Sequence, residues 1–201
     1  MARDIPSTAR IYQLDVTLQE TEPPIWRRVQ VPADITLHRL HEVLQTVLGW
    51  TDSHLYLFEV GPEPIYFGDP DLVEDWPDLR PSRKTKLSRV APAAGAKLVY
   101  EYDLGDSWRH DIVVEKVLPA QAGAGCPVCL AGKRACPPED CGGVHGYAEL
   151  LEVIADPSHE EHDSMLTWLG GSFDPEAFDL DHVNFLLDGR GLMRRVASTS
   201  K

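Results

Sequence analysis

All four cysteines of the chain lie within sixteen residues, and no other feature constrains the folding of a segment more strongly. Cys126 and Cys129 are two residues apart, Cys136 follows after six more residues, and Cys141 after a further four. A tetrahedral zinc ion needs four thiolate or imidazole ligands, and Cys-x2-Cys is a usual spacing for two of them. We therefore expect the four thiolates to hold zinc in a short loop, with His145 as a substitute ligand.

This zinc would be structural, because four protein ligands leave no coordination position open for a substrate. The alternative is that the thiols are free, or pair as a disulfide on handling. The first residues contain no apolar stretch typical of a secretory signal, and no run of about 18 apolar residues occurs, so we expect a cytoplasmic protein without a membrane span. A reducing cytoplasm disfavours disulfides and favours the metal.

The net charge of −13 argues against broad, nonspecific binding of nucleic acid, because the surface would repel a polyanion. One local exception is the basic segment 80–89, which contains three arginines and two lysines. Such a segment is typical of a solvated loop, and a phosphate-contacting patch is the alternative. The end of the chain is acidic, with eleven acids and four bases over residues 145–201.

The chain alternates between strand and helix patterns. Period-two alternation of apolar residues predicts strands at 11–18, 25–31, 54–60, 65–68, 97–103 and 108–118. Helical spacing predicts helices at 37–48, 147–155, 160–169 and 179–187. The first helix would begin after Thr36, end at Gly49 and expose His38, His41 and Gln45 on a polar face. The order predicts an α+β fold with a mixed or antiparallel sheet, a ββαβ start that is β-grasp-like by analogy, and C-terminal helices.

A Gly-Asp pair between two alternating stretches predicts a hairpin turn within residues 104–107. A turn of two or four residues would place Asp103 opposite Trp108 and Glu101 opposite His110. A carboxylate beside an imidazole serves proton transfer or metal binding, whereas the alternative is an ion pair that fixes the strand register.

A second polar turn precedes the helix predicted at 147–155. Glu139 and Asp140 are followed by Gly142 and Gly143, so backbone amides at the helix start could bind an anion, and the acids could bind metal or act as a base. Tight turns and a helix cap are the alternative. We expect this turn and the hairpin to form one polar cleft that holds a divalent cation, with five candidate catalytic residues: Asp103, Asp106, His110, Glu139 and Asp140.

Three motifs carry a family resemblance: LHEV leading to GW and HLYLF over 40–58, YDLGDSWRH over 102–110, and GKRACPPEDCGG through GY over 132–147. With them the chain resembles the plasmid pRiA4b ORF-3-like family over residues 10–188, which implies a single domain there. The residues outside it, 1–9 and 189–201, are expected from their own sequence to be flexible tails. The resemblance implies an association with plasmids and insertion elements but no reaction. Some members are labelled transposon resolvases, and this sequence lacks the serine among arginines and the basic DNA-reading helix that such an activity needs.

These observations lead to three functional expectations. The first is a mobile-element-associated binding or accessory module with a zinc-fastened cysteine loop, whose partner is an unknown protein or an anionic ligand. The second is a metal-dependent hydrolase, acting on phosphodiesters, that uses the Asp/Glu/His cleft. The third is a protein–protein interaction module that docks through its acidic C-terminal helices.

Overall fold

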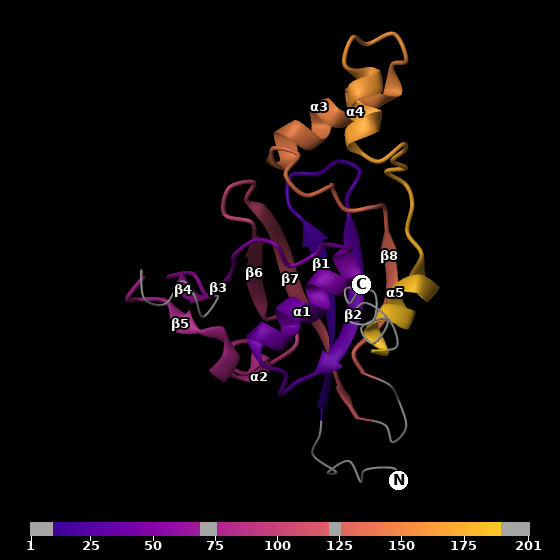
Figure 1. Cartoon of the computed structure of the whole chain (residues 1–201). Coiled ribbons are helices and arrows are strands. Elements are labelled where there is room, and N and C mark those ends of the chain that lie inside the picture. The colour runs from indigo at the N-terminus through magenta and orange to yellow at the C-terminus, as the bar shows by residue number, and fades with distance from the viewer. Residues whose placement is uncertain (1–9, 69–75, 121–125, 190–201) are drawn as a thin grey trace, which may run out of the picture.

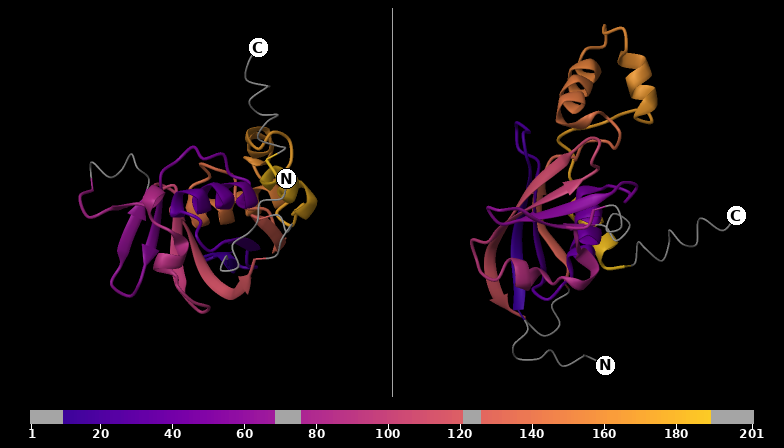
Figure 2. Two further views of the ribbon diagram at one scale, coloured as in Figure 1. Left: turned by 90° about the horizontal axis from the view of Figure 1, so that it is seen from below. Right: turned by 90° about the vertical axis from the view of Figure 1, so that its left-hand side faces the viewer.

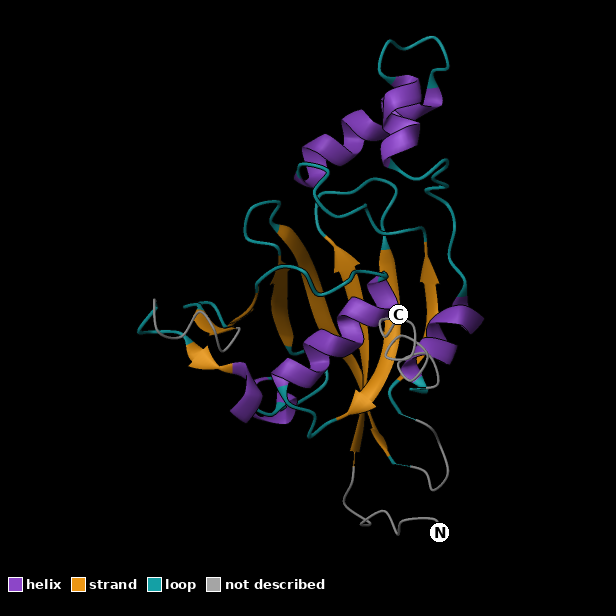
Figure 3. Ribbon diagram, in the orientation of Figure 1, coloured by secondary structure: helices purple, strands orange, loops and turns teal. Residues whose placement is uncertain are grey.

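The computed structural model describes residues 10–68, 76–120 and 126–189, and it confirms the α+β fold class. Within these residues, one mixed sheet of eight strands has the order β5-β4-β3-β6-β7-β1-β2-β8, and five α-helices lie on one face of the sheet, at its edge or beyond the end of its strands (Figure 1, Figure 3). All neighbouring strands are antiparallel except β4 and β5. The strands are β1 (Arg10–Leu18), β2 (Trp26–Pro32), β3 (Tyr56–Val60), β4 (Ile65–Gly68), β5 (Arg80–Pro81), β6 (Lys97–Tyr102), β7 (Trp108–Pro119) and β8 (Val128–Lys133).

The predicted hairpin of β1 and β2 lies beside β7, the longest strand of the sheet. Alternate residues of β1, such as Tyr12, Leu14 and Val16, are fully buried, as the period-two pattern predicted. The chain begins in the order β1, β2, α1, β3, but β3 pairs with β4 and β6 rather than with the first hairpin. The likeness to a β-grasp start therefore stays a prediction.

Helix α1 (Leu37–Leu48) covers one face of the sheet (Figure 1). Its predicted ends are confirmed: Thr36 accepts a hydrogen bond from the Arg39 amide, and Gly49 closes the helix with φ +90°. The predicted exposure of His41 and Gln45 is wrong, since both side chains are buried. They bury polar atoms without penalty because both bond the Tyr100 hydroxyl under the helix.

Two segments expected to be irregular contain regular structure. The cysteine segment forms the edge strand β8, which pairs with β2 along the far side of the sheet. The described part of the predicted surface loop 69–89 forms β5, a 3₁₀ turn at Ser82–Lys84 and the short helix α2 (Leu87–Val90). Backbone bonds to the entrance of α1 hold this segment, among them Leu87 N to Ile35 O at 2.8 Å.

The three predicted C-terminal helices are confirmed as α3 (Gly143–Ala155), α4 (His162–Trp168) and α5 (Leu180–Leu187). Helices α3 and α4 pack on each other beyond the end of the strands, while α5 packs against β8 and α1 (Figure 2). None of the described helices has the length and apolar composition needed to cross a membrane. Of the predicted tails, 1–9 and 190–201 lie outside the described residues.

Candidate functional site

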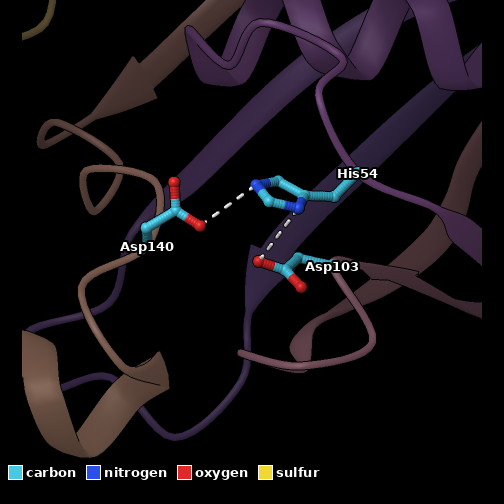
Figure 4. A group of neighbouring side chains, drawn as sticks. All are labelled: His54, Asp103 and Asp140. Carbon is cyan, nitrogen blue, oxygen red and sulfur yellow. Dashed lines mark ion pairs between the residues drawn. The ribbon is translucent and has the colours of Figure 1, made fainter.

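The side chains of His54, Asp103 and Asp140 meet beyond the end of the central strands, although they come from three separate segments (Figure 4). Nδ1 of His54 lies 3.7 Å from Oδ2 of Asp103, and Nε2 lies 3.3 Å from Oδ1 of Asp140. In the described parts of the chain, this is the only group of three or more His, Cys, Asp or Glu side chains whose ligand atoms all lie within 4.8 Å of one another.

Strand pairing places the first two of these residues. Because β3 and β6 are neighbours, His54 just before β3 and Asp103 just after β6 come together, and the Asp103 amide donates to the Leu55 carbonyl at 2.9 Å. The Tyr102 hydroxyl fixes the loop further, since it accepts from the amides of Ser53 at 2.9 Å and His54 at 3.3 Å. The position of the imidazole is thus set by the sheet rather than by a free loop.

Asp103 is held by its own turn. Its backbone has φ +56°, and Oδ1 accepts from the Gly105 amide at 2.9 Å, an arrangement that aspartate tolerates better than most residues. This bond occupies Oδ1, so Oδ2 is the oxygen that lies next to His54. The side chain is largely buried, which strengthens its interaction with any nearby cation.

The turn that carries Asp140 is anchored by Glu139. Its carboxylate accepts from the Thr51 amide at 3.1 Å, from the Thr51 hydroxyl at 2.5 Å and from the Tyr102 hydroxyl at 2.7 Å. Burial raises the pKa of Glu139, but these hydrogen bonds outweigh burial and hold the pKa below its usual range. Trp50 adds a bond from Nε1 to the Pro137 carbonyl at 3.0 Å. Glu139 is therefore a positioning group for the turn.

Asp106 has a similar anchoring role. Its Oδ2 accepts from the Gly142 amide at 3.1 Å and so ties the β6–β7 turn to the start of α3. The two backbones approach closely here, so that a Cβ added to Gly143 would lie only 2.6 Å from the Asp106 carbonyl oxygen. Gly143 also has a left-handed backbone with φ +69°. A glycine is therefore required at 143 for Asp106 and Asp140 to come to the same end of the sheet.

One nitrogen of the His54 imidazole makes no hydrogen bond. Nε2 is shielded from solvent and makes no hydrogen bond of normal geometry, although the Asp140 carboxylate lies 3.3 Å away. Metal–ligand bonds of about 2.1 Å place neighbouring ligands of a tetrahedral ion about 3.4 Å apart. The observed separation therefore matches two ligands of one ion. Asp103 is the third candidate ligand: its Oδ2 lies beside the other ring nitrogen, Nδ1, and the ligand atoms of the three residues lie within 4.8 Å of one another. Three such ligands would leave a position open for water or a substrate.

A polar hollow of about 520 Å³ is lined by two of the three side chains, His54 and Asp103, and its size is in the usual range of small-molecule sites. Its charged and titratable walls are three histidines, two aspartates and one arginine: His38, His41, His54, Asp52, Asp103 and Arg83. His41 is fixed there by Asp52, whose Oδ1 lies 2.7 Å from Nε2, and by the Tyr100 hydroxyl at 2.8 Å from Nδ1. The hollow thus offers an acid–imidazole pair beside the three-residue cluster.

The predicted pairing in the β6–β7 hairpin is wrong by one residue. The turn spans the five residues 103–107, so Tyr100 pairs with His110, Glu101 with Arg109, and Tyr102 with Trp108. A shift of one residue moves every side chain to the opposite face. Glu101 therefore forms an ion pair with Arg109 at 2.6 Å rather than facing the imidazole.

His110 consequently lies in the hydrophobic core and not in the cleft. Its ring is fully buried and packs against Trp50 and Tyr100, and Nδ1 bonds the Trp108 carbonyl at 3.0 Å. Burial lowers the pKa of His110 to about 4. The structure thus brings four of the five predicted residues, all carboxylates, to one end of the sheet, and His54 supplies the imidazole there. Whether these carboxylates are catalytic stays a prediction.

The four cysteines are free thiols and do not form a metal-ligating group in the described part of the chain. Cys126 donates to the Gln30 carbonyl at 3.3 Å, whereas Cys136 accepts from Arg27 Nη2 at 3.5 Å. Burial raises the pKa of all four thiols, to about 11 at Cys126 and about 12 at Cys141. His145 is almost fully exposed on α3, 3.6 Å from Glu149. The zinc-fastened loop is therefore not confirmed and stays a prediction.

Sequence reasoning did not select His54 as a site residue. It is a single histidine at the start of a predicted strand, and the one acid within a strand period, Asp52, does not belong to its cluster in the structure. The available signal was its place inside the second half of the first family motif, 54–58, together with the wider polar stretch 51–54. Its role depends on contacts with residues about 50 and 90 positions away, which no local pattern encodes.

Known proteins support the family resemblance. The plasmid pRiA4b ORF-3-like protein family matches residues 10–182. An uncharacterized protein, y4hQ, of Sinorhizobium fredii (strain NBRC 101917 / NGR234) is 43% identical over 183 residues, which are 90% of this chain and 92% of that protein. The crystal structure of a protein of unknown function, MM3350, from Methanosarcina mazei Go1 is similar with a TM-score of 0.77 and 40% identity, covering 86% of this chain and 97% of that one. The chain belongs to the plasmid pRiA4b ORF-3-like family.

Proposed function

We propose that the protein holds a divalent cation on His54, Asp103 and Asp140 and uses it to bind an anionic ligand in the adjoining polar hollow. The observation that carries this proposal is the shielded His54 Nε2, which lies 3.3 Å from the Asp140 carboxylate without a hydrogen bond. A buried polar atom normally finds a partner, and a cation between nitrogen and carboxylate would supply one. The cation would also offset the negative charge of two neighbouring carboxylates.

The ligand set indicates which ions fit. One imidazole and two carboxylates suit first-row transition ions such as Zn²⁺ or Mn²⁺, whereas Mg²⁺ and Ca²⁺ take mainly oxygen ligands. Three protein ligands leave at least one position open, as in catalytic rather than structural sites. The hydrogen bonds of Tyr102 to the loop before His54, and of Gly105 to Asp103, act as the outer shell that orients two of the ligands.

A second candidate function is metal-dependent hydrolysis. The observation that favours it is the pair of histidines in the same hollow, because His41 with Asp52 forms an acid–imidazole pair and His38 is half-buried beside it. A water on the cation could attack a phosphodiester while an imidazole takes its proton. Hydrolysis of bis(p-nitrophenyl) phosphate with Mn²⁺ that disappears in Asp140→Asn would support this candidate, whereas no turnover would leave a binding protein.

The cation site predicts a specific binding defect. Titration of the full chain with Mn²⁺ at pH 7.5, followed by electron paramagnetic resonance, is expected to show one site per chain that weakens at least tenfold in Asp140→Asn. Asparagine accepts the left-handed backbone of residue 140, where φ is +60°, so the fold persists while a charged ligand is lost.

The matched control is Asp163→Asn on α4, whose carboxylate is fully exposed and which is expected to bind Mn²⁺ as the parent does. Equal weakening in both variants, or no Mn²⁺ binding by the parent, would show that the cluster is only a histidine–aspartate ion pair.

Zinc analysis of protein purified without chelators tests the cysteine prediction separately. Zinc lost in Cys129→Ser but retained in Asp140→Asn would assign it to the cysteine loop.

A further inference from the structure

The basic segment 80–89 meets the cation site through a single residue. Among its described residues, Arg83 alone lines the polar hollow, which His54 and Asp103 also line. Arg83 is exposed and makes no hydrogen bond or ion pair with any residue that the structure describes. Its five donors are therefore free to bind a ligand in the hollow.

The position of Arg83 is fixed by its neighbours. The Tyr56 hydroxyl lies 2.7 Å from Oγ of Ser82, which is fully buried, and 2.8 Å from Nδ1 of His38 on α1. The amide of Leu37 at the start of α1 donates to the Thr85 carbonyl at 2.9 Å. The turn that carries Arg83 is thus held against α1 on both sides. A guanidinium on such a turn loses less freedom on binding than one on a free loop.

From this arrangement we infer that the anionic ligand carries a phosphate group, held between the cation on His54, Asp103 and Asp140 and the guanidinium of Arg83. This inference rests on the proposed cation site and names the class of its ligand. A phosphate dianion has three terminal oxygens, so it can bind a metal through one and accept a forked pair of hydrogen bonds through others. A divalent cation and an arginine together also offset its charge.

The ligand is a small molecule rather than a nucleic acid. The hollow of about 520 Å³ has the size of a small-molecule site. A net charge of −13 opposes the many backbone phosphates of a polymer, and a single well-placed phosphate avoids that repulsion. Only one of the five bases in segment 80–89 lines the hollow, whereas a nucleic-acid surface would use several of them together.

The experiment uses the full chain loaded with Mn²⁺ at 150 mM salt and methylphosphonate, a phosphate-like dianion without a hydrolysable ester bond. Protein-bound Mn²⁺ is expected to accelerate the ³¹P relaxation of methylphosphonate in a saturable way. Arg83→Ala is expected to weaken this binding at least tenfold while Mn²⁺ binding changes less than twofold. Arg89→Ala, in the same segment but outside the hollow, is expected to change neither.

The outcomes separate the two proposals. Equal losses in Arg83→Ala and Arg89→Ala would indicate diffuse attraction and overturn the inference, and so would an unchanged affinity in Arg83→Ala with Mn²⁺ still bound. If Mn²⁺ does not bind, the proposed cation site is wrong. The ³¹P chemical shift of methylphosphonate without metal then tests the anion site: binding that is lost in Arg83→Ala but kept in Arg89→Ala supports the role of Arg83. No binding of methylphosphonate by the parent protein would overturn the anion site as well. An oligonucleotide serves as a competitor, with its concentration counted in phosphate groups. If it displaced methylphosphonate at a lower concentration than methylphosphonate itself needs for binding, the ligand would be a nucleic acid rather than a small molecule.

Discussion

Replacing Arg27 by alanine is expected to lower the free energy of unfolding by about 3–5 kcal/mol. The guanidinium is buried and donates to three backbone carbonyls, at 2.8 Å to Val47 and Trp26 and at 2.9 Å to Lys133. It also stacks on the ring of Phe178, 4.3 Å from the centroid. The variant removes the Arg27 donor from each of these carbonyls and opens a cavity between β2, α1 and the end of β8.

The neighbouring Arg28 provides the matched control, because it lies on the same strand but faces the opposite side of the sheet. It is one-third exposed and pairs with Glu115 at 2.7 Å. Exposed ion pairs contribute about 0–1 kcal/mol, so Arg28→Ala is expected to cost no more than that. Urea unfolding at pH 7.5, followed by tryptophan fluorescence, measures both values. A loss below about 1 kcal/mol in Arg27→Ala would contradict the role given to the buried cation.

Arg27 also changes the interpretation of the cysteine segment. The sequence suggested that this stretch needs a metal to fix its conformation, but hydrogen bonds attach it to the sheet at several points. Arg27 donates to the Lys133 carbonyl and to Sγ of Cys136. Arg134 donates to the Pro23 carbonyl at 2.8 Å. Trp50 then holds Pro137. These bonds, together with the pairing of β8 with β2, position the Glu139–Asp140 turn without requiring a metal.

Local patterns were sufficient for most of the elements. The first helix was predictable to the residue because Thr36 and Gly49 mark its ends and apolar residues recur at helical spacing between them. The strand at 128–133 was missed because it lies on the sheet edge and owes its conformation to pairing with β2. Its residues have no strong preference of their own, so the partner strand decides.

The candidate site was predictable only in its carboxylates. Asp103 and Asp140 lie in turns with recognisable Gly, Asp and Pro signals, and turns carry exposed functional groups. The imidazole was assigned to the wrong residue because the assignment depended on the length of one turn. Five residues at 103–107 instead of four send His110 into the core, and the pairing of β3 with β6 brings His54 into its place. Neither event leaves a local trace in the sequence.

The burial of His110 predicts a pronounced loss of stability in acid. Nδ1 faces the Trp108 carbonyl and so carries the proton of the neutral ring, while Nε2 is buried without a hydrogen bond of normal geometry. Protonation of Nε2 would place a charge among aromatic rings, which is why burial lowers the pKa of His110 from 6.5 to about 4. In the unfolded chain the same imidazole takes up a proton near pH 6.5.

The sign of the effect follows from the two values of the pKa. Because the unfolded chain binds the proton more tightly, stability is full above pH 6.5 and falls progressively to about pH 4, by about 3 kcal/mol in total. His110→Asn keeps a donor for Trp108 but cannot titrate, so its unfolding free energy should fall by about 3 kcal/mol less than that of the parent between pH 7 and pH 4. His145→Asn, at an exposed position, should follow the parent curve. Denaturant unfolding at a series of pH values measures the unfolding free energy of each variant. Parallel curves of this free energy against pH for the parent and His110→Asn would mean that the buried imidazole does not cause the loss of stability in acid.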